Sequence, residues 1–244
     1  MEWQEEAIIL GVRPHGETSA IVEVMTRQHG RHMGVLKGGR SRRFAPLLQA
    51  GNCVLASWWA RLDEHLGAFR FEPIAFWAAR CIAAPQALYA LQIAAAHLRL
   101  LPERDPHPTL YDGLQLLLNH CEEPLLCAEL LVRFEVLLLA ELGFGLDLSA
   151  CVATGNTDDL IYVSPKSARA VCAQAGQPWK DRLLALPLFL AKKLGRPSNL
   201  EELQKGFALT HYFLYQNVWG PRQIEPPMIR DGFIRLIERQ LLSV

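Results

Sequence analysis

The sequence predicts an α+β protein built from two parts: a small five-stranded barrel in residues 1–78 and a helical domain in residues 79–244, the latter with an irregular insertion at about 146–180. Up to residue 74 the chain alternates short runs of β character with glycine-containing turns and shows no helical period. After Pro73 it becomes rich in Ala and Leu at helical spacing. Because 50% of the 244 residues are apolar, the chain can bury a sizeable core.

The barrel is predicted from five runs of β character, which cover residues 7–12, 19–25, 32–36, 53–60 and 66–74. The turn signal at residues 28–31 makes a hairpin of the second and third runs. Side chains alternate between the two faces of a strand, so Trp58 and Trp59 face opposite sides, whereas Phe69 and Phe71 share a side. Five strands in so short a segment indicate a Greek-key barrel such as the OB-fold.

Positive charge is concentrated between residues 27 and 61. No Asp or Glu lies between Gln28 and Leu62, although the whole chain is neutral, with 25 Lys and Arg against 25 Asp and Glu. The cations of this stretch are Arg27, Arg31, Lys37, Arg40, Arg42, Arg43 and Arg61, and they are densest in residues 37–43. Such a local run predicts a site for a polyanion, with a solvated loop as the alternative.

Aromatic residues near this basic run make single-stranded nucleic acid the expected polyanion. Small open barrels bind single strands by combining a cationic groove with aromatic side chains on which bases stack. The candidate aromatic residues are Trp58, Trp59, Phe44 and Phe69. The alternative for each of them is a place in the core, where aromatic residues of half-buried strands commonly lie.

The helical domain is predicted from apolar periodicity and helix-end signals. Residues 76–101 form one helix kinked at Pro85 or two helices in series, and Thr109 caps the next helix. Residues 125–142 are apolar on nearly every side and predict a buried central helix, with Glu129 and Arg133 spaced for an ion pair. Further helices are expected in the segments 164–176, 183–194, 199–219 and 229–242, with a capping box at residues 198–201 opening the third of them.

Motifs for catalysis are missing from the sequence. It contains no glycine-rich phosphate motif before a helix, no G-x-S-x-G and no H-E-x-x-H. Asp158 and Asp159 are adjacent carboxylates without a third acid at a convincing spacing. We therefore expect a binding protein and not an enzyme. A metal-dependent nuclease centred on this pair, and a purely protein-binding helical scaffold, are the alternatives.

The expected compartment is the cytoplasm. The first six residues, MEWQEE, lack the basic segment of a signal peptide, and the longest uncharged runs, 44–60 and 81–96, contain prolines and are too short to span a bilayer. The 6 cysteines show no C-x-x-C pair and predict buried, reduced thiols.

Several short motifs follow one another in a specific order along nearly the whole chain. In the first half these are Arg13 to Thr18, Thr26 to Arg31, and Lys37-Gly38-Gly39-Arg40. In the second half they are Arg133-Phe134-Glu135, then residues 142–145 (LGFG) leading to Cys151, and residues 162–165 (YVSP) followed by 169–171 (RAV). In this order the motifs resemble the RecO family of bacterial recombination mediators.

The resemblance implies a non-enzymatic, cytoplasmic DNA repair protein that associates with the nucleoid during repair. Members of this kind bind single- and double-stranded DNA without sequence specificity, anneal complementary strands, and with RecR help to load RecA onto DNA coated by single-strand-binding protein. The resemblance agrees with the DNA contacts predicted above from charge and aromatic side chains, which are Arg27, Arg31, Lys37, Arg40, Arg42, Arg43, Trp58 and Trp59. It also implies that the acidic C-terminal tail of single-strand-binding protein docks on the helical domain, with Arg133 as a contact. No cofactor and no membrane partner are expected.

One departure from the family pattern concerns zinc. Many RecO proteins carry a four-cysteine zinc site in the second half of the chain. Here Cys151 and Cys172 fall where two ligands are expected, but Thr154 and Ala175 occupy the positions of the other two. Two thiolates do not complete a tetrahedral structural site, so we expect no bound zinc.

Overall fold

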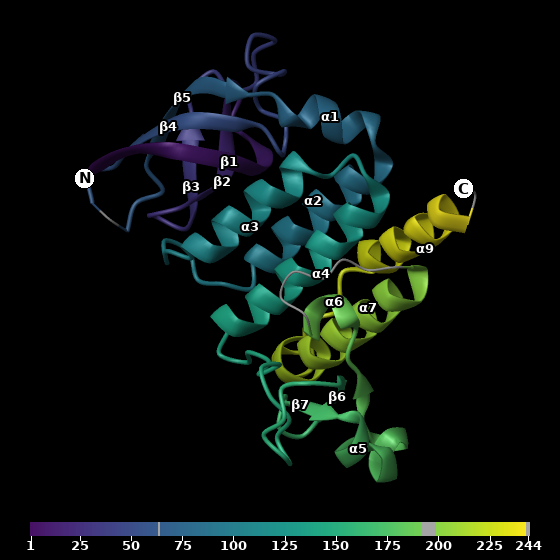
Figure 1. The fold of residues 1–244 in the computed structure, drawn as a ribbon. Helices are drawn as coiled ribbons and strands as arrows, with labels where there is room; N and C mark the ends of the chain where they lie inside the picture. Colours follow the sequence, from purple (N-terminus) through teal and green to yellow (C-terminus); the bar gives the residue numbers. More distant parts are fainter. Residues whose placement is uncertain (63, 192–198, 243–244) are drawn as a thin grey trace. The chain divides into compact units, whose positions relative to one another are not determined.

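The computed structural model describes residues 1–62, 64–191 and 199–242. The chain divides into two compact units, Met1–Glu123 (unit 1) and Pro124–Val244 (unit 2), and each is described by itself. The predicted α+β class is confirmed, because a barrel of strands is followed by helices (Figure 1). Among the described residues, no helix is long and apolar enough to cross a membrane.

The described part of unit 1 begins with five strands that close into a barrel in the order β1-β2-β3-β5-β4, the order of an OB-fold. The strands are β1 (Glu2–His15), β2 (Ser19–Thr26), β3 (Arg31–Leu36), β4 (Cys53–Trp59) and β5 (Ala68–Ala75). All five predicted strands are therefore confirmed. The first is longer than predicted, because the polar residues 2–6 also pair with β4.

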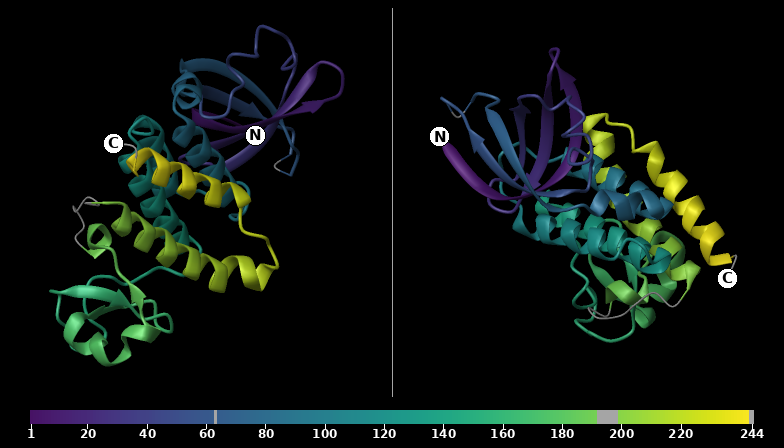
Figure 2. Two further views of the ribbon diagram at one scale, coloured as in Figure 1. Left: turned by 90° about the vertical axis from the view of Figure 1, so that its right-hand side faces the viewer. Right: turned by 90° about the horizontal axis from the view of Figure 1, so that it is seen from above.

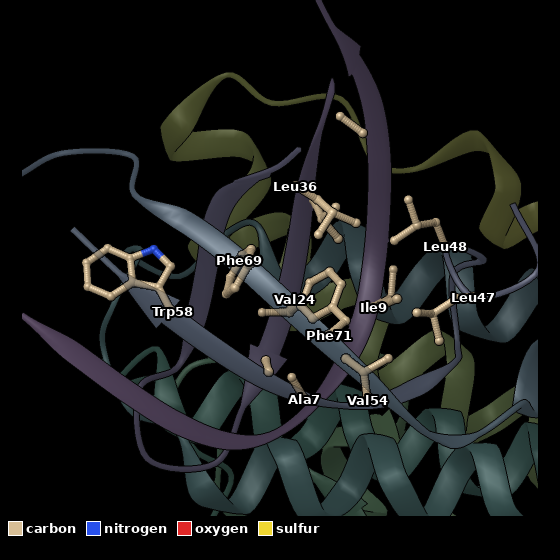
Figure 3. Packing of buried hydrophobic residues seen from close by; sticks show 13 residues of the cluster. Ala7, Ile9, Val24, Leu36, Leu47, Leu48, Val54, Trp58, Phe69 and Phe71 are labelled. Atoms are coloured by element: carbon tan, nitrogen blue, oxygen red, sulfur yellow. The ribbon is translucent and has the colours of Figure 1, made fainter. Parts of the chain in front are cut away.

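Strict alternation of side chains fills the barrel. In β2, Ala20, Val22 and Val24 face inward and are fully or almost fully buried. Phe69 and Phe71 of β5 share the inner face, as predicted, and their rings stack at 5.0 Å (Figure 3). Gly34 of β3 leaves room for the Phe69 ring, because a Cβ at this position would lie 2.6 Å from it.

Three helices complete unit 1: α1 (Trp77–Ala83), α2 (Pro85–Leu98) and α3 (Pro108–Asn119). Of the two arrangements predicted for residues 76–101, two helices in series are found, and Pro85 starts the second. The cap prediction at Thr109 is wrong by two positions, because His107 is the N-cap and Pro108 is the first helical residue. Contacts of α2 with β1 and of α3 with β2 join these helices to the barrel. The predicted domain boundary at residue 78 stays a prediction.

Unit 2 is organised around α4 (Pro124–Glu141), the predicted central helix, which packs against α7 (Leu200–Leu214) and α9 (Met228–Leu242). Figure 2 shows the chain reversing direction between α7 and α9 through a π-helical turn (Tyr215–Trp219), the short α8 (Gly220–Arg222) and a loop. The described N-cap of α7 is Asn199, whose side chain accepts a hydrogen bond from the Glu202 amide. Ser198, which the predicted capping box includes, lies outside the described residues.

The predicted insertion contains a small sheet, which Figure 1 shows as a lobe of unit 2. Its strands are β6 (Leu160–Val163), β7 (Ala170–Cys172) and β8 (Leu184–Ala185). Between β7 and β8 lie α5 (Ala173–Gly176) and a 3-10 turn (Gln177–Arg182), and α6 (Leu188–Ala191) follows β8. The helix predicted for residues 164–176 is wrong, because Ser164 and Arg169 close a turn between β6 and β7. The helix predicted for 183–194 is shorter than expected in its described part, and residues 192–194 lie outside that part.

Candidate nucleic-acid interface

A groove in unit 1 brings basic and aromatic side chains together. It has a volume of about 520 Å³ and lies beside the basic loop, by which we mean residues 37–43. Its lining includes Lys37, Arg43 and Phe44 from the loop region, Trp59 from β4 and Arg70 from β5. The remaining lining residues are Leu36, Ala68, Phe69, Phe71, Glu72 and Pro73.

Apolar anchors and a buried amide fix the chain that carries the basic loop. Leu47 and Leu48 insert into the barrel core and are 8% exposed. The Asn52 side chain donates hydrogen bonds to the carbonyls of Pro46 and Leu47, at 2.9 Å each, and accepts one from the amide of Ala78 at 3.0 Å. The basic loop is therefore carried by a segment with fixed ends.

Strand pairing places the other wall of the groove. Trp59 pairs with Ala68, and Ser57 pairs with Arg70, across β4 and β5. Because side chains alternate, Trp59 and Arg70 lie on the outer face of the barrel, opposite to their neighbours Trp58 and Phe69. The Trp59 side chain is 45% exposed, so its ring is accessible for stacking.

The charge of the groove favours an anion. The lining contains three cations, Lys37, Arg43 and Arg70, and one carboxylate, Glu72. An oxygen of Glu72 lies 3.6 Å from the guanidinium of Arg70. The side chains of this pair are 74% and 57% exposed, and an ion pair so exposed contributes little energy. Arg43 also lies over the Phe44 ring at 5.9 Å, so that a cation and an aromatic face are offered together. The groove can thus hold phosphates and stack bases at the same place.

The structure separates the predicted site residues into two groups. Lys37, Arg43 and Trp59 line the groove, and Arg42 is exposed beside Arg43 in the basic loop. Arg40 is exposed as well, but its guanidinium donates hydrogen bonds to the carbonyls of Gly16 and Glu17, at 2.8 and 2.9 Å. Arg40 therefore fastens the basic loop to the turn between β1 and β2.

Arg27 and Arg31 are engaged in ion pairs within unit 1. Arg27 contacts both carboxylate oxygens of Asp112, at 3.0 and 3.2 Å, and this pair raises the pKa of Arg27. Arg31 is 11% exposed and lies 3.0 Å from Glu23 and 3.5 Å from Glu103. Along the chain the nearest acidic residue to both arginines is Glu23, which pairs with Arg31, whereas Asp112 and Glu103 come from distant segments that only the fold brings near. These ion pairs occupy the two guanidinium groups that were predicted to contact DNA.

Trp58 and Phe69 belong to the core. Trp58 is 2% exposed and donates a hydrogen bond from its indole to the carbonyl of Leu66, and Phe69 is 3% exposed. Figure 3 shows both rings within the cluster of buried apolar residues. The expectation that Trp58 and Phe69 stack on bases is corrected accordingly, because almost none of their surface is exposed.

Arg70 is a groove residue that the sequence analysis missed. It is separated from the basic loop by the whole of β4, so a search for runs of charge does not find it. Its position between Phe69 and Phe71 is a signal that could have found it. Both phenylalanines face inward, and Arg70 must then face outward on the same strand.

Comparison with known proteins identifies the family of this chain. Residues 1–76 match the sequence model described as "Recombination protein O N terminal", and residues 85–223 match "Recombination protein O C terminal". The chain belongs to the RecO family. "DNA repair protein RecO" of Brucella abortus (strain 2308) is 60% identical over 241 residues, which cover 99% of this chain and 98% of that protein. The protein of the same name from Bartonella quintana is 60% identical over 240 residues, covering 98% and 99%.

Arg133, the protein contact implied by the resemblance to RecO proteins, is held inside unit 2. Its guanidinium donates to Glu129 at 2.8 Å, which confirms the predicted ion pair, and to the carbonyl of Phe189 at 2.8 Å. It also lies over the Phe189 ring at 5.5 Å. These contacts join α4 to α6 and give Arg133 a role in packing.

Cys151 and Cys172, the two candidate zinc ligands, are both buried in unit 2. Thr154 stands at the place of a third ligand, and its hydroxyl lies 3.7 Å from the Cys172 sulfur. Burial alone would raise the pKa of Cys151, but hydrogen bonds from Thr154 and from the backbone amides of residues 153, 154 and 172 lower it to about 6. Within the described residues, no group of three or more His, Cys, Asp and Glu side chains is placed to hold a metal ion. The absence of zinc stays a prediction.

Asp158 and Asp159, the carboxylates of the alternative nuclease hypothesis, lie on a turn before β6. Both Asp158 and Asp159 are exposed, and Asp159 has a φ of 54°, which belongs to a tight turn. The amide of Asp158 donates to the Asn156 side chain at 3.1 Å. Nothing in the described surroundings of the pair favours a nuclease over a binding protein.

Proposed function

We propose that this chain binds DNA through the groove beside the basic loop, without reading its sequence, as a non-enzymatic DNA repair protein. The observation that carries the proposal is the meeting of Lys37, Arg43 and Arg70 with Trp59 and Phe44 in one hollow of an OB-fold barrel. The name "DNA repair protein" of relatives that are 60% identical over nearly the whole chain supports the role.

The groove chemistry fits a single strand better than a duplex. Cations at the groove neutralise phosphates and release counterions, a contribution that is independent of sequence. Trp59 offers an accessible ring on which any base can stack, because every base has a π-face, and Phe44, which is half-buried against the barrel core, adds apolar contact beside it. A duplex keeps its bases stacked on one another and engages the cations only, so we expect double-stranded DNA to bind more weakly at this site.

Annealing follows from the same mode of binding. A strand held by its phosphates and by stacking keeps the hydrogen-bonding edges of its bases free for a complementary strand. The further steps rest on family membership: contact with the acidic tail of single-strand-binding protein through the helical domain, and the loading of RecA with the help of RecR. Membership supports these steps and assigns no residue to them.

The proposal is tested by neutralising the groove. The variant Lys37→Gln/Arg43→Gln/Arg70→Gln should bind an oligonucleotide at least about 10-fold more weakly at low salt and should anneal complementary strands more slowly. The matched control Lys166→Gln/Lys180→Gln/Arg235→Gln removes the same charge from exposed positions of unit 2 and should stay close to wild type. Equal behaviour of the two variants would place DNA binding elsewhere on the chain.

A further inference from the structure

A column of three aromatic rings stands at another part of the barrel surface. The Trp3 ring stacks on His29 with centroids 4.5 Å apart and planes 10° apart, and it lies 6.0 Å and 18° from Trp58. Strand pairing brings the three together. Trp3 is opposite Trp58 in the β1–β4 pair, and Ala7 is opposite Thr26 in the β1–β2 pair, so the turn that carries His29 lies beside the start of β1.

The outermost ring of the column is His29, whose side chain is 36% exposed. Its orientation is fixed by Glu5, which contacts the ring Nδ1 at 2.8 Å and also accepts a hydrogen bond from the amide of Gln28 at 2.8 Å. The column ends inside the barrel at Trp58, which is buried. A rigid stack with one accessible end is a preorganised platform for another flat ring.

A hollow of about 520 Å³ lies against this column, and we call it the aromatic pocket. Its lining residues are Met1, Glu2, Trp3, Gln28, His29, His32, Trp58 and Arg104. The Arg104 guanidinium lies over the Trp58 ring at 5.4 Å and is held by the carbonyl of His65 at 2.7 Å. The charged groups of the lining are Arg104, the N-terminal ammonium of Met1, which is held by the Ala60 carbonyl, and Glu2, whereas most of the remaining lining is aromatic. Its chemistry suits an uncharged aromatic ring.

The groove and the aromatic pocket each share lining residues with a further hollow. A third hollow of about 360 Å³ lies between them and is lined by Glu2, Trp3, Gln4, Ser57, Trp58 and Trp59. It shares Trp59 with the groove and shares Trp3 and Trp58 with the aromatic pocket. A strand of DNA that occupies both the groove and the aromatic pocket would cross the paired strands β1 and β4.

We propose that the aromatic pocket receives one unpaired base of a single strand held in the groove, where the base lies against the rings of the His29–Trp3–Trp58 column. This inference rests on the proposed function and adds a subsite to it. A base within a duplex is stacked between its neighbours and cannot enter. The pocket therefore makes the protein prefer single strands to double strands, whereas the cations of the groove serve both.

The test compares ordinary and abasic DNA on the full chain. The probes are an oligodeoxythymidine of about 16 nucleotides, the upper end of the site size of one such barrel, and the same length of sugar-phosphate without bases. His29→Ala should weaken binding of the ordinary strand by about 5- to 150-fold and of the abasic strand by less than about 2-fold. His29→Phe keeps a flat ring and should restore most of the loss. Urea unfolding of both variants confirms that the barrel is intact.

Photochemical cross-linking gives an independent readout. An oligonucleotide with 5-iodouracil bases should attach to His29 or Trp3 in the wild-type protein, as mapped by mass spectrometry. Equal losses on ordinary and abasic strands, or cross-links confined to Trp59 and Phe44, would overturn the pocket. The groove variant separates the two proposals. It should weaken both strands alike, and if it binds like wild type while His29→Ala loses the ordinary strand, the groove fails and the pocket stands.

Discussion

At the residue scale, the basic loop contains cations with different tasks. Arg42 and Arg43 extend from the loop, whereas the Arg40 guanidinium is bound to two carbonyls of the β1–β2 turn. The Arg40 amide adds a hydrogen bond to the carbonyl of Thr18 at 3.0 Å. Residue type alone does not distinguish these arginines. They differ because the loop contacts the β1–β2 turn at Arg40.

Replacing Arg40 should therefore cost more stability than replacing its neighbour. Arg40→Ala removes two hydrogen bonds to carbonyls, and we expect the free energy of unfolding to fall by about 1 kcal/mol. Arg42→Ala should change it by less than about 0.5 kcal/mol, because its side chain is exposed. Urea denaturation of the two variants measures the difference. Identical midpoints would show that the loop does not depend on Arg40.

At the element scale, a buried ion pair holds the three long helices of unit 2 together. Arg230 of α9 contacts the two carboxylate oxygens of Glu135 of α4 at 2.7 and 2.9 Å, and it donates to the Thr210 hydroxyl and the Phe207 carbonyl of α7. Thr210 also donates to Glu135. Burial opposes the charge on Arg230, but Glu135 outweighs it and raises the pKa of the guanidinium. The guanidinium therefore stays charged and joins α9 to both α4 and α7.

Removing one partner of this ion pair should destabilise unit 2 more than replacing both partners by apolar residues. Arg230→Ala removes the cation that balances Glu135, which is 0% exposed, and should lower stability by about 3 to 5 kcal/mol. Glu135→Leu combined with Arg230→Met removes both charges at similar volume and should recover a large part of that loss. Denaturant unfolding of the single and double variants measures both. A double variant as unstable as the single one would show that packing, not an unpaired charge, dominates.

Metal content tests the reading of the insertion. We expect the purified protein to contain no stoichiometric zinc, because Thr154 and Ala175 replace two of the four cysteine ligands found in many RecO proteins. Elemental analysis after dialysis measures this. One zinc per chain that is lost in the Cys151→Ser/Cys172→Ser variant would contradict it.

The sequence predicted elements well where local signals and tertiary structure agree. All five strands of the barrel, the break at Pro85 and the central helix α4 were predicted from alternation, proline and apolar periodicity. It failed at residues 164–176, where Ser-Pro suggested a helix start but the pairing of β6 with β7 requires a turn. It also failed to assign Arg31 and Trp58, because the partners that bury them, Glu103 and Leu66, are fixed only by the fold.

At the scale of the whole molecule, the chain has no net charge and a sequence pI of about 7.1. Long-range attraction between the protein and DNA is therefore weak, and affinity must come from local groups that meet phosphates at short range. The groove concentrates three cations against one carboxylate, and such a site responds to salt through the number of phosphates it neutralises.

The slope of log affinity against log salt should therefore report how many groove cations meet phosphates. If Lys37, Arg43 and Arg70 each meet one phosphate, their replacement by Gln should flatten the slope of log affinity against log salt by about 2, at roughly 0.7 per contact on a single strand. Trp59→Ala should lower affinity by about 1 to 3 kcal/mol and leave the slope unchanged, because stacking releases no counterions. Titrations of fluorescent single-stranded DNA between low and physiological salt measure both quantities. A slope that stays at the wild-type value in the triple variant would mean that these cations face solvent and that the phosphates are neutralised elsewhere.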